Sequence, residues 1–258
     1  MKQEIYILTH KEIDNKNIDL SNYIPIQVGA ELSNKDICEI KDNINDNISY
    51  KNKNYLETTG IYWIWKNSNA DIKGQMQFRR FLSVNPNFTE VILNDYDIIT
   101  ANPLKLEISI QFHYEICHDI DDILGVRDIL IEYYNDYVYS YDKYIAKGNI
   151  LYYANSFIAK KEIYDNLCEF CFSVLNKFEE KFKYYDDNIL TEHAKNILLK
   201  WSNEKNKKYN HSDIGQIEYQ KRICGYLFER LVTLYVFHNK LKVYSCGEYI
   251  KMENEMPI

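Results

Sequence analysis

A run of alternating apolar and polar residues, Lys73–Leu82 (KGQMQFRRFL), is the feature that most constrains the fold. Within it, Gln75–Phe81 has the period of two that is typical of a β-strand. The run leads into Arg79 and Arg80, whose planar guanidinium groups suit bidentate contacts with phosphate. Adjacent residues on a strand face opposite sides, so both arginines reach one ligand only where the strand ends between them. The alternative is one structural ion pair and one solvated arginine, and these residues alone favour it slightly.

Strand-like runs and amphipathic helical segments alternate in the first half of the chain, and helices predominate in the second. The other predicted strands are Glu4–Leu8, Pro25–Val28, Ile98–Thr100, Leu106–Phe112, a strand pair or a strand with a turn in Ile150–Ala159, and an edge strand at Leu241–Tyr244. The predicted helices are Tyr55–Lys66, Phe88–Leu93, a helix from about Asp119 to Lys143, Lys160–Phe182, Asp187–Trp201 and Gly215–His238. A charged connector is expected at Ser202–Ser212. This order predicts an α/β fold, with a mixed sheet flanked by helices, in one domain over residues 1–258.

The charge balance excludes one class of partner. The formal net charge is −7, which argues against a nucleic acid held by bulk electrostatics. Any anionic ligand must therefore meet a local basic cluster. We expect no signal peptide, and no apolar run approaches the roughly 18 residues of a spanning helix. The expected location is cytoplasmic, with peripheral contact at the inner face of the plasma membrane left open.

Six cysteines occur, and only Cys168 and Cys171 form a CxxC motif. This pair lies inside an amphipathic segment beside Phe170 and Phe172, so buried core thiols are much favoured over a metal or redox site. Scattered thiols of this kind are typical of a reduced cytoplasmic protein.

Two polar segments are candidates for ligand binding. The first predicted strand ends at Thr9, His10 and Lys11, and α/β sheets bind ligands outside the carboxyl ends of their strands. Asn34–Asn54 is a long polar stretch, and long loops in compact domains are often functional. A plain surface turn and an asparagine-rich genome bias are the respective alternatives, about equally favoured.

Acidic residues offer two further possibilities. Asp95 and Asp97 form a DxD motif that could hold a divalent metal, but the motif precedes a predicted strand instead of ending one, which disfavours a metal role. His113, His118 and the aspartates from Asp119 to Asp122 lack the spacing of a compact metal site. Capping of the following helix is the favoured role for Asp119.

The last helix places Arg222 and Glu229 seven residues apart, so they share one face, together with Tyr226. A buried ion network is favoured there from the residues alone. Glu57 is the lone carboxylate of Tyr55–Lys66, and a helix-dipole role and a ligand contact are equally favoured for it.

Eight segments in order resemble a bacterial glycosyltransferase family of GT-A type, found in capsular, exopolysaccharide and O-antigen gene clusters. They are IYILTHK (Ile5–Lys11), PIQVGA (Pro25–Ala30), DNISYKN (Asp46–Asn52), YLETTGIYWIWKN (Tyr55–Asn67), GQMQFRRF (Gly74–Phe81), YDIIT (Tyr96–Thr100), ANSFIAKKEIYD (Ala154–Asp165) and RICGYLFERL (Arg222–Leu231). Each segment alone is weak, but together they cover nearly the whole chain. Some members of that family are linked to galactofuranosyl transfer.

The chain departs from the family pattern at three places. Asn45-Asp46-Asn47 stands where Gly-Asp-Asn is usual, and Gln77-Phe78-Arg79-Arg80 stands where His-Tyr-Arg-Arg is usual. Asn155-Ser156 replaces an Asn-Met pair. The second departure removes an imidazole and keeps both arginines.

The resemblance implies a GT-A-like, Rossmann-type fold. Residues 1–112 would bind the nucleotide sugar, and residues 113–258 would form a helix-rich acceptor half. The reaction would move a hexose, galactofuranose being one candidate, from a UDP-sugar to a hydroxyl of a surface-polysaccharide or lipid-linked glycan. The expected nucleotide-sugar site consists of Thr9, His10, Lys11, Gly29, Asn47, Ser49, Lys51, Asn52, Gln77, Arg79, Arg80 and Asn155.

The resemblance also frames the chemistry. We expect Arg79, more than Arg80, to neutralise the donor diphosphate without a metal. Mn²⁺ or Mg²⁺ on Asp95 and Asp97 is the alternative. An inverting transfer needs a carboxylate base, for which Glu229, oriented by Arg222, is the first candidate and Asp119 the second.

Two other classes of function remain. One is a non-catalytic carbohydrate- or nucleotide-binding protein with a decayed transferase site. The other, a nucleotide hydrolase or phosphotransferase, is least favoured because the chain has neither a P-loop motif nor GxGxxG.

Overall fold

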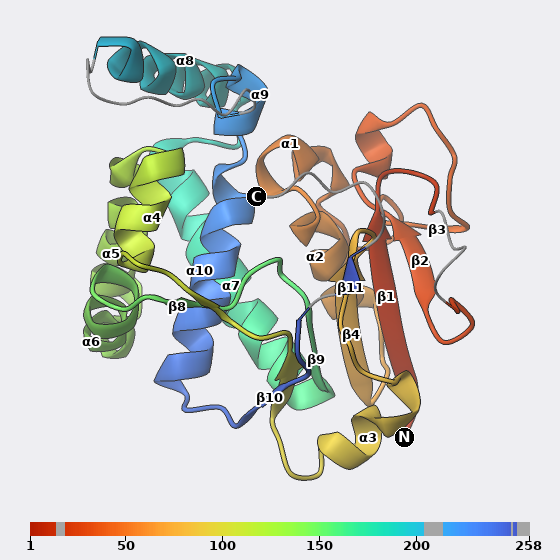
Figure 1. Cartoon of the computed structure of the whole chain (residues 1–258). Coiled ribbons are helices and arrows are strands. Elements are labelled where there is room, and N and C mark those ends of the chain that lie inside the picture. The colour runs from red at the N-terminus through yellow and green to blue at the C-terminus, as the bar shows by residue number, and fades with distance from the viewer. Residues whose placement is uncertain (14–18, 204–213, 249, 252–258) are drawn as a thin grey trace.

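A computed structural model of the chain describes residues 1–13, 19–203, 214–248 and 250–251. At its centre is a mixed sheet with the strand order β10-β6-β9-β4-β1-β2-β3, in which β5 pairs with β4 and β11 with β5 (Figure 1). The strands are β1 (Gln3–Thr9), β2 (Ile24–Gln27), β3 (Ile40–Lys41), β4 (Ile72–Gln77), β5 (Arg80–Phe81), β6 (Ile98–Thr100), β9 (Phe157–Lys160), β10 (Val243–Ser245) and β11 (Ile250–Lys251). A separate pair consists of β7 (Leu104–Lys105) and β8 (Ile150–Leu151).

Helices predominate after β6, as the sequence pattern predicts. They are α1 (Asn52–Tyr55), α2 (Thr58–Asn67), α3 (Thr89–Ile92), α4 (Ile110–Cys117), α5 (Ile120–Tyr133), α6 (Val138–Tyr141), α7 (Lys161–Phe182), α8 (Asp187–Asn203), α9 (Ile217–Gln220) and α10 (Ile223–His238). Most of them gather on one side of the sheet (Figure 1). The predicted α/β fold with a helix-rich second half is confirmed.

Strand direction gives the sheet one edge at which several segments meet. β1 runs parallel to both β2 and β4, whereas β9 runs antiparallel to both β4 and β6. The carboxyl ends of β1, β2, β4 and β6 therefore lie at the same edge as the amino end of β9. In an open α/β sheet, this is the edge where ligands bind.

The alternation of side chains along β1 divides the core in two. Tyr6 and Leu8 belong to the larger hydrophobic core, which α2, α5, α7 and α10 share. Ile5 and Ile7 face a smaller core on the opposite side of the sheet. Because both faces of β1 are covered, the strand reads as a continuous apolar run, as expected for a central parallel strand.

Helix α7 is the longest helix and packs along the larger core. Its apolar residues recur every three or four positions, which places one stripe against the sheet. Cys168 and Cys171 lie in this stripe, fully buried, and burial raises the pKa of both thiols well above the ordinary value. The prediction that this CxxC pair consists of core thiols is confirmed, and all six cysteines are free.

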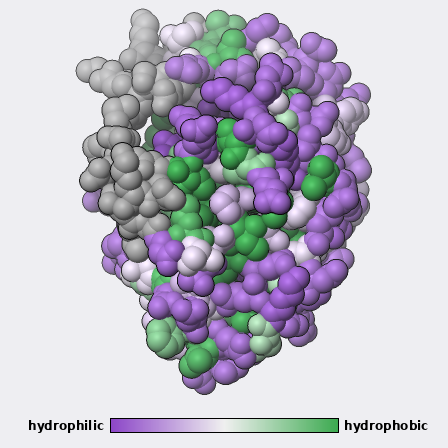
Figure 2. Space-filling model, turned by 90° about the vertical axis from the view of Figure 1, so that its right-hand side faces the viewer, coloured by the Kyte–Doolittle hydropathy of each residue, from purple (hydrophilic) through white to green (hydrophobic). Residues whose placement is uncertain are grey.

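β3, the edge strand at one end of the sheet, is only two residues long. On the face of the molecule that lies to the right in Figure 1, hydrophilic residues predominate, and hydrophobic ones form a broken patch near the centre (Figure 2). A short edge strand and a polar surface both limit pairing with another chain. At the opposite end, β10 is the edge strand that the sequence predicts.

One predicted strand is wrong. Leu106–Phe112 is not a strand, because β7 ends at Lys105 and α4 begins at Ile110. Ser109 caps this helix by accepting a hydrogen bond from the backbone N–H of Phe112. The serine N-cap decides in favour of a helix, although the apolar alternation before it suggests a strand.

Three predicted long elements are interrupted. The helix predicted at Tyr55–Lys66 is divided at Leu56, whose φ of 53° is left-handed. The helix predicted to reach Lys143 ends at Tyr133, after which short 3₁₀, α and π turns follow. The helix predicted at Gly215–His238 is divided before Ile223.

Residues 204–212 of the predicted charged connector lie outside the described residues, and Ser202 belongs to α8. Within the described residues, no helix combines the length and the apolar character needed to cross a bilayer.

A close approach of two strands predicts the effect of a single methyl group. A Cβ atom at Gly74 of β4 would lie 2.6 Å from Cγ1 and 3.1 Å from Cβ of Ile158 on β9. Because Ile158 is β-branched and buried between strands, it cannot move away easily. We expect Gly74→Ala to lower the free energy of unfolding by about 1–3 kcal/mol, measured by urea denaturation.

Gly215→Ala is the matched control, because a Cβ atom there meets nothing within 4 Å. Its effect should stay within about 0.5 kcal/mol. Equal stabilities of the two variants would contradict the tight packing of β4 on β9.

Candidate active site

A cleft of about 360 Å³ opens at the edge of the sheet where β1, β2 and β4 end. The amino-terminal part of α10 lines its other side. The lining residues are Leu8, His10, Val28, Asn52, Leu56, Glu57, Gln77, Phe78, Arg79, Arg80, Ala154, Asn155, Arg222, Gly225, Tyr226 and Glu229. Of the predicted nucleotide-sugar residues, the cleft brings together His10, Asn52, Gln77, Arg79, Arg80 and Asn155, with Arg222 and Glu229 from the predicted catalytic set.

The two arginines share the cleft because β4 ends before them. The strand predicted to run to Phe81 stops at Gln77, and a turn at Phe78 and Arg79 leads into β5. β5 returns antiparallel to β4, and Arg80 Nη1 donates a 3.4 Å hydrogen bond to Gln77 Oε1. The exposed Arg79 guanidinium lies 5.0 Å from the centre of the Phe78 ring. The strict strand alternation that separates adjacent side chains therefore does not apply here.

Positive charge is concentrated around His10. Burial lowers the pKa of this imidazole, and the charges of Lys11, Arg79 and Arg222 lower it further. His10 is therefore neutral at pH 7, and the fixed cations at this end of the cleft are guanidinium groups. Such groups match the geometry of phosphate oxygens.

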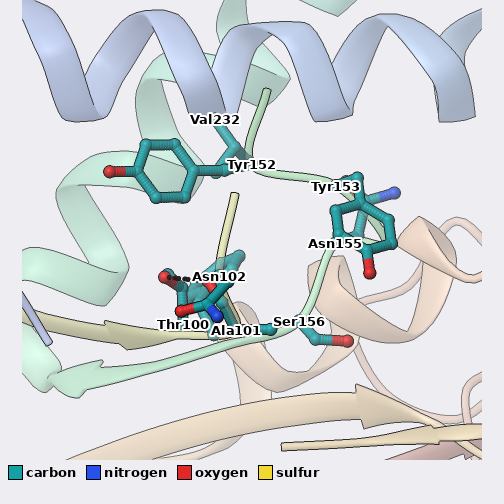
Figure 3. A pocket seen from close by; sticks show the side chains of 9 residues that line it. Thr100, Ala101, Asn102, Tyr152, Tyr153, Asn155, Ser156 and Val232 are labelled. Atoms are coloured by element: carbon teal, nitrogen blue, oxygen red, sulfur yellow. Dashed lines mark hydrogen bonds between the residues drawn. The ribbon is translucent and has the colours of Figure 1, made fainter. Parts of the chain in front are cut away.

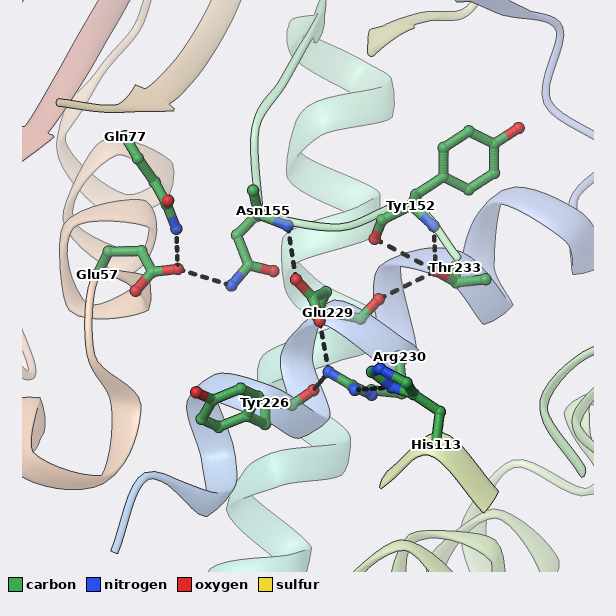
Figure 4. A network of polar contacts seen from close by, with 10 residues as sticks. Glu57, Gln77, His113, Tyr152, Asn155, Tyr226, Glu229, Arg230 and Thr233 are labelled. Atoms are coloured by element: carbon green, nitrogen blue, oxygen red, sulfur yellow. Dashed lines mark hydrogen bonds and ion pairs between the residues drawn. The ribbon is translucent and has the colours of Figure 1, made fainter. Parts of the chain in front are cut away.

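Glu57 reaches the cleft from the break between α1 and α2. Its Oε1 accepts hydrogen bonds from Gln77 Nε2 at 2.8 Å and from Asn155 Nδ2 at 3.0 Å (Figure 4). Burial raises the pKa of Glu57, and the charge of Glu229 raises it further, whereas its own backbone N–H and the two amides oppose the shift. The sequence favours a helix-dipole role and a ligand contact equally for Glu57. The structure places this residue in the lining of the cleft, where a ligand contact is possible.

Unusual backbone conformations cluster at the cleft. The described part of the chain contains six non-glycine residues with positive φ, and three of them, Leu56, Ala154 and Asn155, line the cleft. Such conformations cost energy and persist only where the surroundings hold them, most often at functional sites. The Asn155 side chain is buried, and its Oδ1 has no hydrogen-bond partner among the described residues.

Glu229 is tied to its own helix and to the segment before β9. Its Oε1 accepts a 2.5 Å hydrogen bond from the backbone N–H of Ala154, and its Oε2 forms an ion pair with Arg230 (Figure 4). The prediction that Arg222 orients Glu229 is thus corrected, because the partner is the next residue in sequence. Arg222 lies at the N-cap of α10, and its guanidinium lies 5.4 Å from the Tyr219 ring centre.

Arg230 is held from a second side. Its Nη2 donates to His113 Nδ1 at 3.2 Å, and Nη1 donates to the carbonyl of Tyr226 at 3.1 Å. Burial and the neighbouring Arg230 charge lower the pKa of His113 to about 4, so the imidazole is neutral and can accept this hydrogen bond. Sequence reasoning missed Arg230, because a residue adjacent to Glu229 on a helix is expected to face elsewhere.

Several predicted binding residues form the wall behind the cleft. The buried Asp42 carboxylate accepts hydrogen bonds from the backbone N–H groups of Gly29 and Ala30, at 2.9 and 3.0 Å. It also accepts from the hydroxyls of Ser49 and Thr59, at 2.5 and 2.6 Å. Gly29 and Ser49 thus serve this structural hub and do not line the cleft.

The rest of the asparagine-rich loop is likewise tied to protein partners. Lys51 pairs with Glu179 at 2.6 Å. The Asn47 side chain donates to the carbonyl of Asn45 and accepts from the backbone N–H of Ser49. Asn52 does reach the cleft, and its Nδ2 donates to the carbonyl of Leu56 at 2.6 Å.

The remaining predicted residues do not line the cleft. Thr9 is buried and exchanges hydrogen bonds with the backbone of Lys11. Asp119 caps α5 and contacts Lys200, in agreement with the favoured capping role. Asp97 accepts a hydrogen bond from the backbone of Lys242 at the opposite edge of the sheet.

No group of three or more His, Cys, Asp and Glu side chains in the described ranges could hold a metal ion. A much smaller pocket of about 10 Å³, the size of one water molecule, shares Asn155 with the cleft (Figure 3). It is formed where the end of β6 meets the segment before β9.

The Asp42 hub yields a stability prediction. Asp42→Ala would leave two backbone and two hydroxyl donors without this acceptor in the interior. We expect the free energy of unfolding to fall by about 3 kcal/mol or more in urea denaturation followed by tryptophan fluorescence. Asp36→Ala is the control, because that side chain is 77% exposed and pairs with Lys41 at the surface. Its cost should not exceed about 1 kcal/mol, and an equally small loss in Asp42→Ala would contradict the hub.

Known proteins provide a comparison for this fold and cleft. A solved apo structure of WbbM, described as a bifunctional glycosyltransferase, matches with a TM-score of 0.75 and 22% sequence identity. The match covers 98% of this chain and 46% of that chain, so this chain spans about half the length of WbbM. The likeness confirms that the chain shares the fold of part of a glycosyltransferase.

Comparisons of sequence give a family but no curated relative. No curated protein matches the chain. A family model described as a domain of unknown function, DUF4422, matches residues 4–198, which is well over half of the chain. The chain therefore belongs to the DUF4422 family.

Proposed function

We propose that the chain is a glycosyltransferase that moves a hexose from a nucleoside-diphosphate sugar to a hydroxyl group of a glycan acceptor. The observation that carries this proposal is the composition of one cleft. Guanidinium groups from the β4–β5 turn and from α10 meet the carboxyl groups of Glu57 and Glu229 there. Transfer from such a donor requires both cations for a leaving diphosphate and a carboxylate for the incoming hydroxyl.

The fold supports the same proposal. The cleft lies outside the carboxyl ends of parallel strands, which is where nucleotides bind in open α/β sheets. WbbM, a glycosyltransferase by its description, shares this fold over nearly the whole of the present chain. The family resemblance favours UDP as the nucleotide and galactofuranose as one candidate sugar.

The diphosphate would lie against Arg79 and Arg80. Arg79 is exposed at the turn and free to close on a ligand, whereas Arg80 is anchored in β5 beside Gln77. Fixed guanidinium groups offset the charge that develops on the leaving diphosphate. Asp97, the alternative metal ligand, lies at the other edge of the sheet, so metal-independent transfer is the form of the proposal.

The acceptor remains defined only by class. The part of the cleft that Glu57, Asn155 and Glu229 line offers carboxyl and amide groups that can hydrogen-bond sugar hydroxyls. A surface-polysaccharide or lipid-linked glycan fits the resemblance, and a lipid-linked acceptor would bring the protein to the inner face of the membrane.

Arg79→Ala tests the donor site. We expect turnover with the preferred UDP-sugar to fall by about 10²-fold or more, because one cation facing the leaving group is lost. The measurement is UDP release with and without acceptor, over a panel of UDP-sugars, in the presence and absence of EDTA. Activity should persist with EDTA.

Lys195→Ala is the matched control, since Lys195 is an exposed cation of α8 and does not line the cleft. It should leave turnover nearly unchanged. Strict dependence on Mn²⁺ or Mg²⁺ would overturn the metal-independent form of the proposal. If no nucleotide shifts the melting temperature of the parent chain, a decayed binding protein becomes the better description.

A further inference from the structure

The two carboxyl groups in the cleft differ in how much of each is already engaged. Both oxygens of Glu229 have protein partners, the Ala154 N–H on Oε1 and Arg230 on Oε2. These bonds join α10 to the segment that presents Asn155. Glu229 therefore holds the shape of the cleft. If it accepted a proton, it would weaken its bonds to Ala154 or Arg230.

Glu57 has the opposite arrangement. Both of its amide donors, Gln77 and Asn155, bond the same oxygen, Oε1. The backbone N–H of Glu57 also bonds its own carboxyl group, and in the described part of the chain no further residue donates to it. Figure 4 shows the second oxygen, Oε2, turned away from the two amides. The two amides thus fix the orientation of the carboxyl group through one oxygen, and they leave the other oxygen able to accept a proton.

The supports of Glu57 are themselves held firmly. Gln77 ends the central strand β4 and also accepts from Arg80, which links this carboxyl group to the cationic end of the cleft. Asn155 is buried and has a left-handed backbone. Leu56, directly before Glu57, is left-handed too. A group oriented this rigidly is preorganised for a reaction at one point in the cleft.

We propose that Glu57 is the general base of the transfer and that Glu229 is a positioning residue. This assignment rests on the proposed function. The proton of the acceptor hydroxyl moves to Glu57 Oε2 as the acceptor oxygen bonds to the anomeric carbon. The bond from that carbon to the diphosphate oxygen breaks, and its electron pair leaves with UDP beside Arg79 and Arg80. Attack opposite to the leaving group inverts the anomeric centre.

The protonation behaviour of Glu57 fits this role. Burial raises the pKa of the carboxyl group above its ordinary value of 4.5, with a further contribution from the charge of Glu229. A base whose pKa is raised towards the working pH accepts a proton more readily. The acid side of the profile of kcat/KM against pH should therefore report the ionisation of Glu57.

Glu57→Gln is the decisive variant, because it keeps the size of the side chain and an oxygen for the amide contacts. We expect a UDP-induced shift in melting temperature close to that of the parent chain. Turnover should fall by about 10²–10⁴-fold, and the acid limb of the pH profile should disappear. In Glu57→Ala, added sodium formate should restore part of the turnover by supplying a carboxylate.

Two further variants separate catalysis from structure. Glu229→Gln should lower the melting temperature and reduce turnover while retaining the acid limb. Glu192→Gln, on an exposed side chain of α8, should change none of these quantities.

Three outcomes would overturn the assignment. The first is Glu57→Gln with turnover within a few-fold of the parent. The second is an increased KM for the donor with unchanged kcat, which would make Glu57 a donor ligand. The third is loss of the acid limb in Glu229→Gln alone. A parent chain that neither binds UDP nor turns over any UDP-sugar would instead overturn the proposed function, and this assignment with it.

Discussion

The pair of amide hydrogen bonds on Glu57 Oε1 is the interaction on which the cleft depends. It joins the break between α1 and α2, the end of β4, and the segment before β9, which are far apart in sequence. Each of these segments borders a regular element, so its backbone can turn towards the same point. A single carboxyl oxygen with two donors holds them together, and the arginines that follow Gln77 are placed relative to that point.

Two other carboxylates complete the frame in the same manner. Asp42 gathers four donors behind the cleft, and Glu229 ties α10 to Ala154. Buried Asp42 and half-buried Glu229 are stable in such places because hydrogen bonds replace the water that burial removes. The same hydrogen bonds help to hold the left-handed residues Ala154 and Asn155 in the conformation that lines the cleft.

Sequence periodicity predicts some elements of this fold correctly and others not. The buried stripe of α7 and the short apolar strands β1, β2 and β6 follow from periodicity, because one strong core decides their conformation. Leu106–Phe112 was predicted as a strand because its apolar alternation conceals a serine-capped helix start. The breaks at Leu56 and before Ile223 carry no glycine or proline signal, and the contacts around them decide where the helices stop.

The sequence by itself determined the class of fold, the burial of Cys168 and Cys171, and the candidates Arg79, Arg80, Asn155 and Glu229. These depend on local pattern and on residue chemistry, which are present in any segment of the chain. Only the tertiary structure decided that β4 stops before Arg79, that Arg230 pairs with Glu229, and that both amides bond one oxygen of Glu57. The physical reason is that each depends on contacts with segments distant in sequence, such as the bond from Arg230 to His113, and packing of the whole sheet decides where those segments meet.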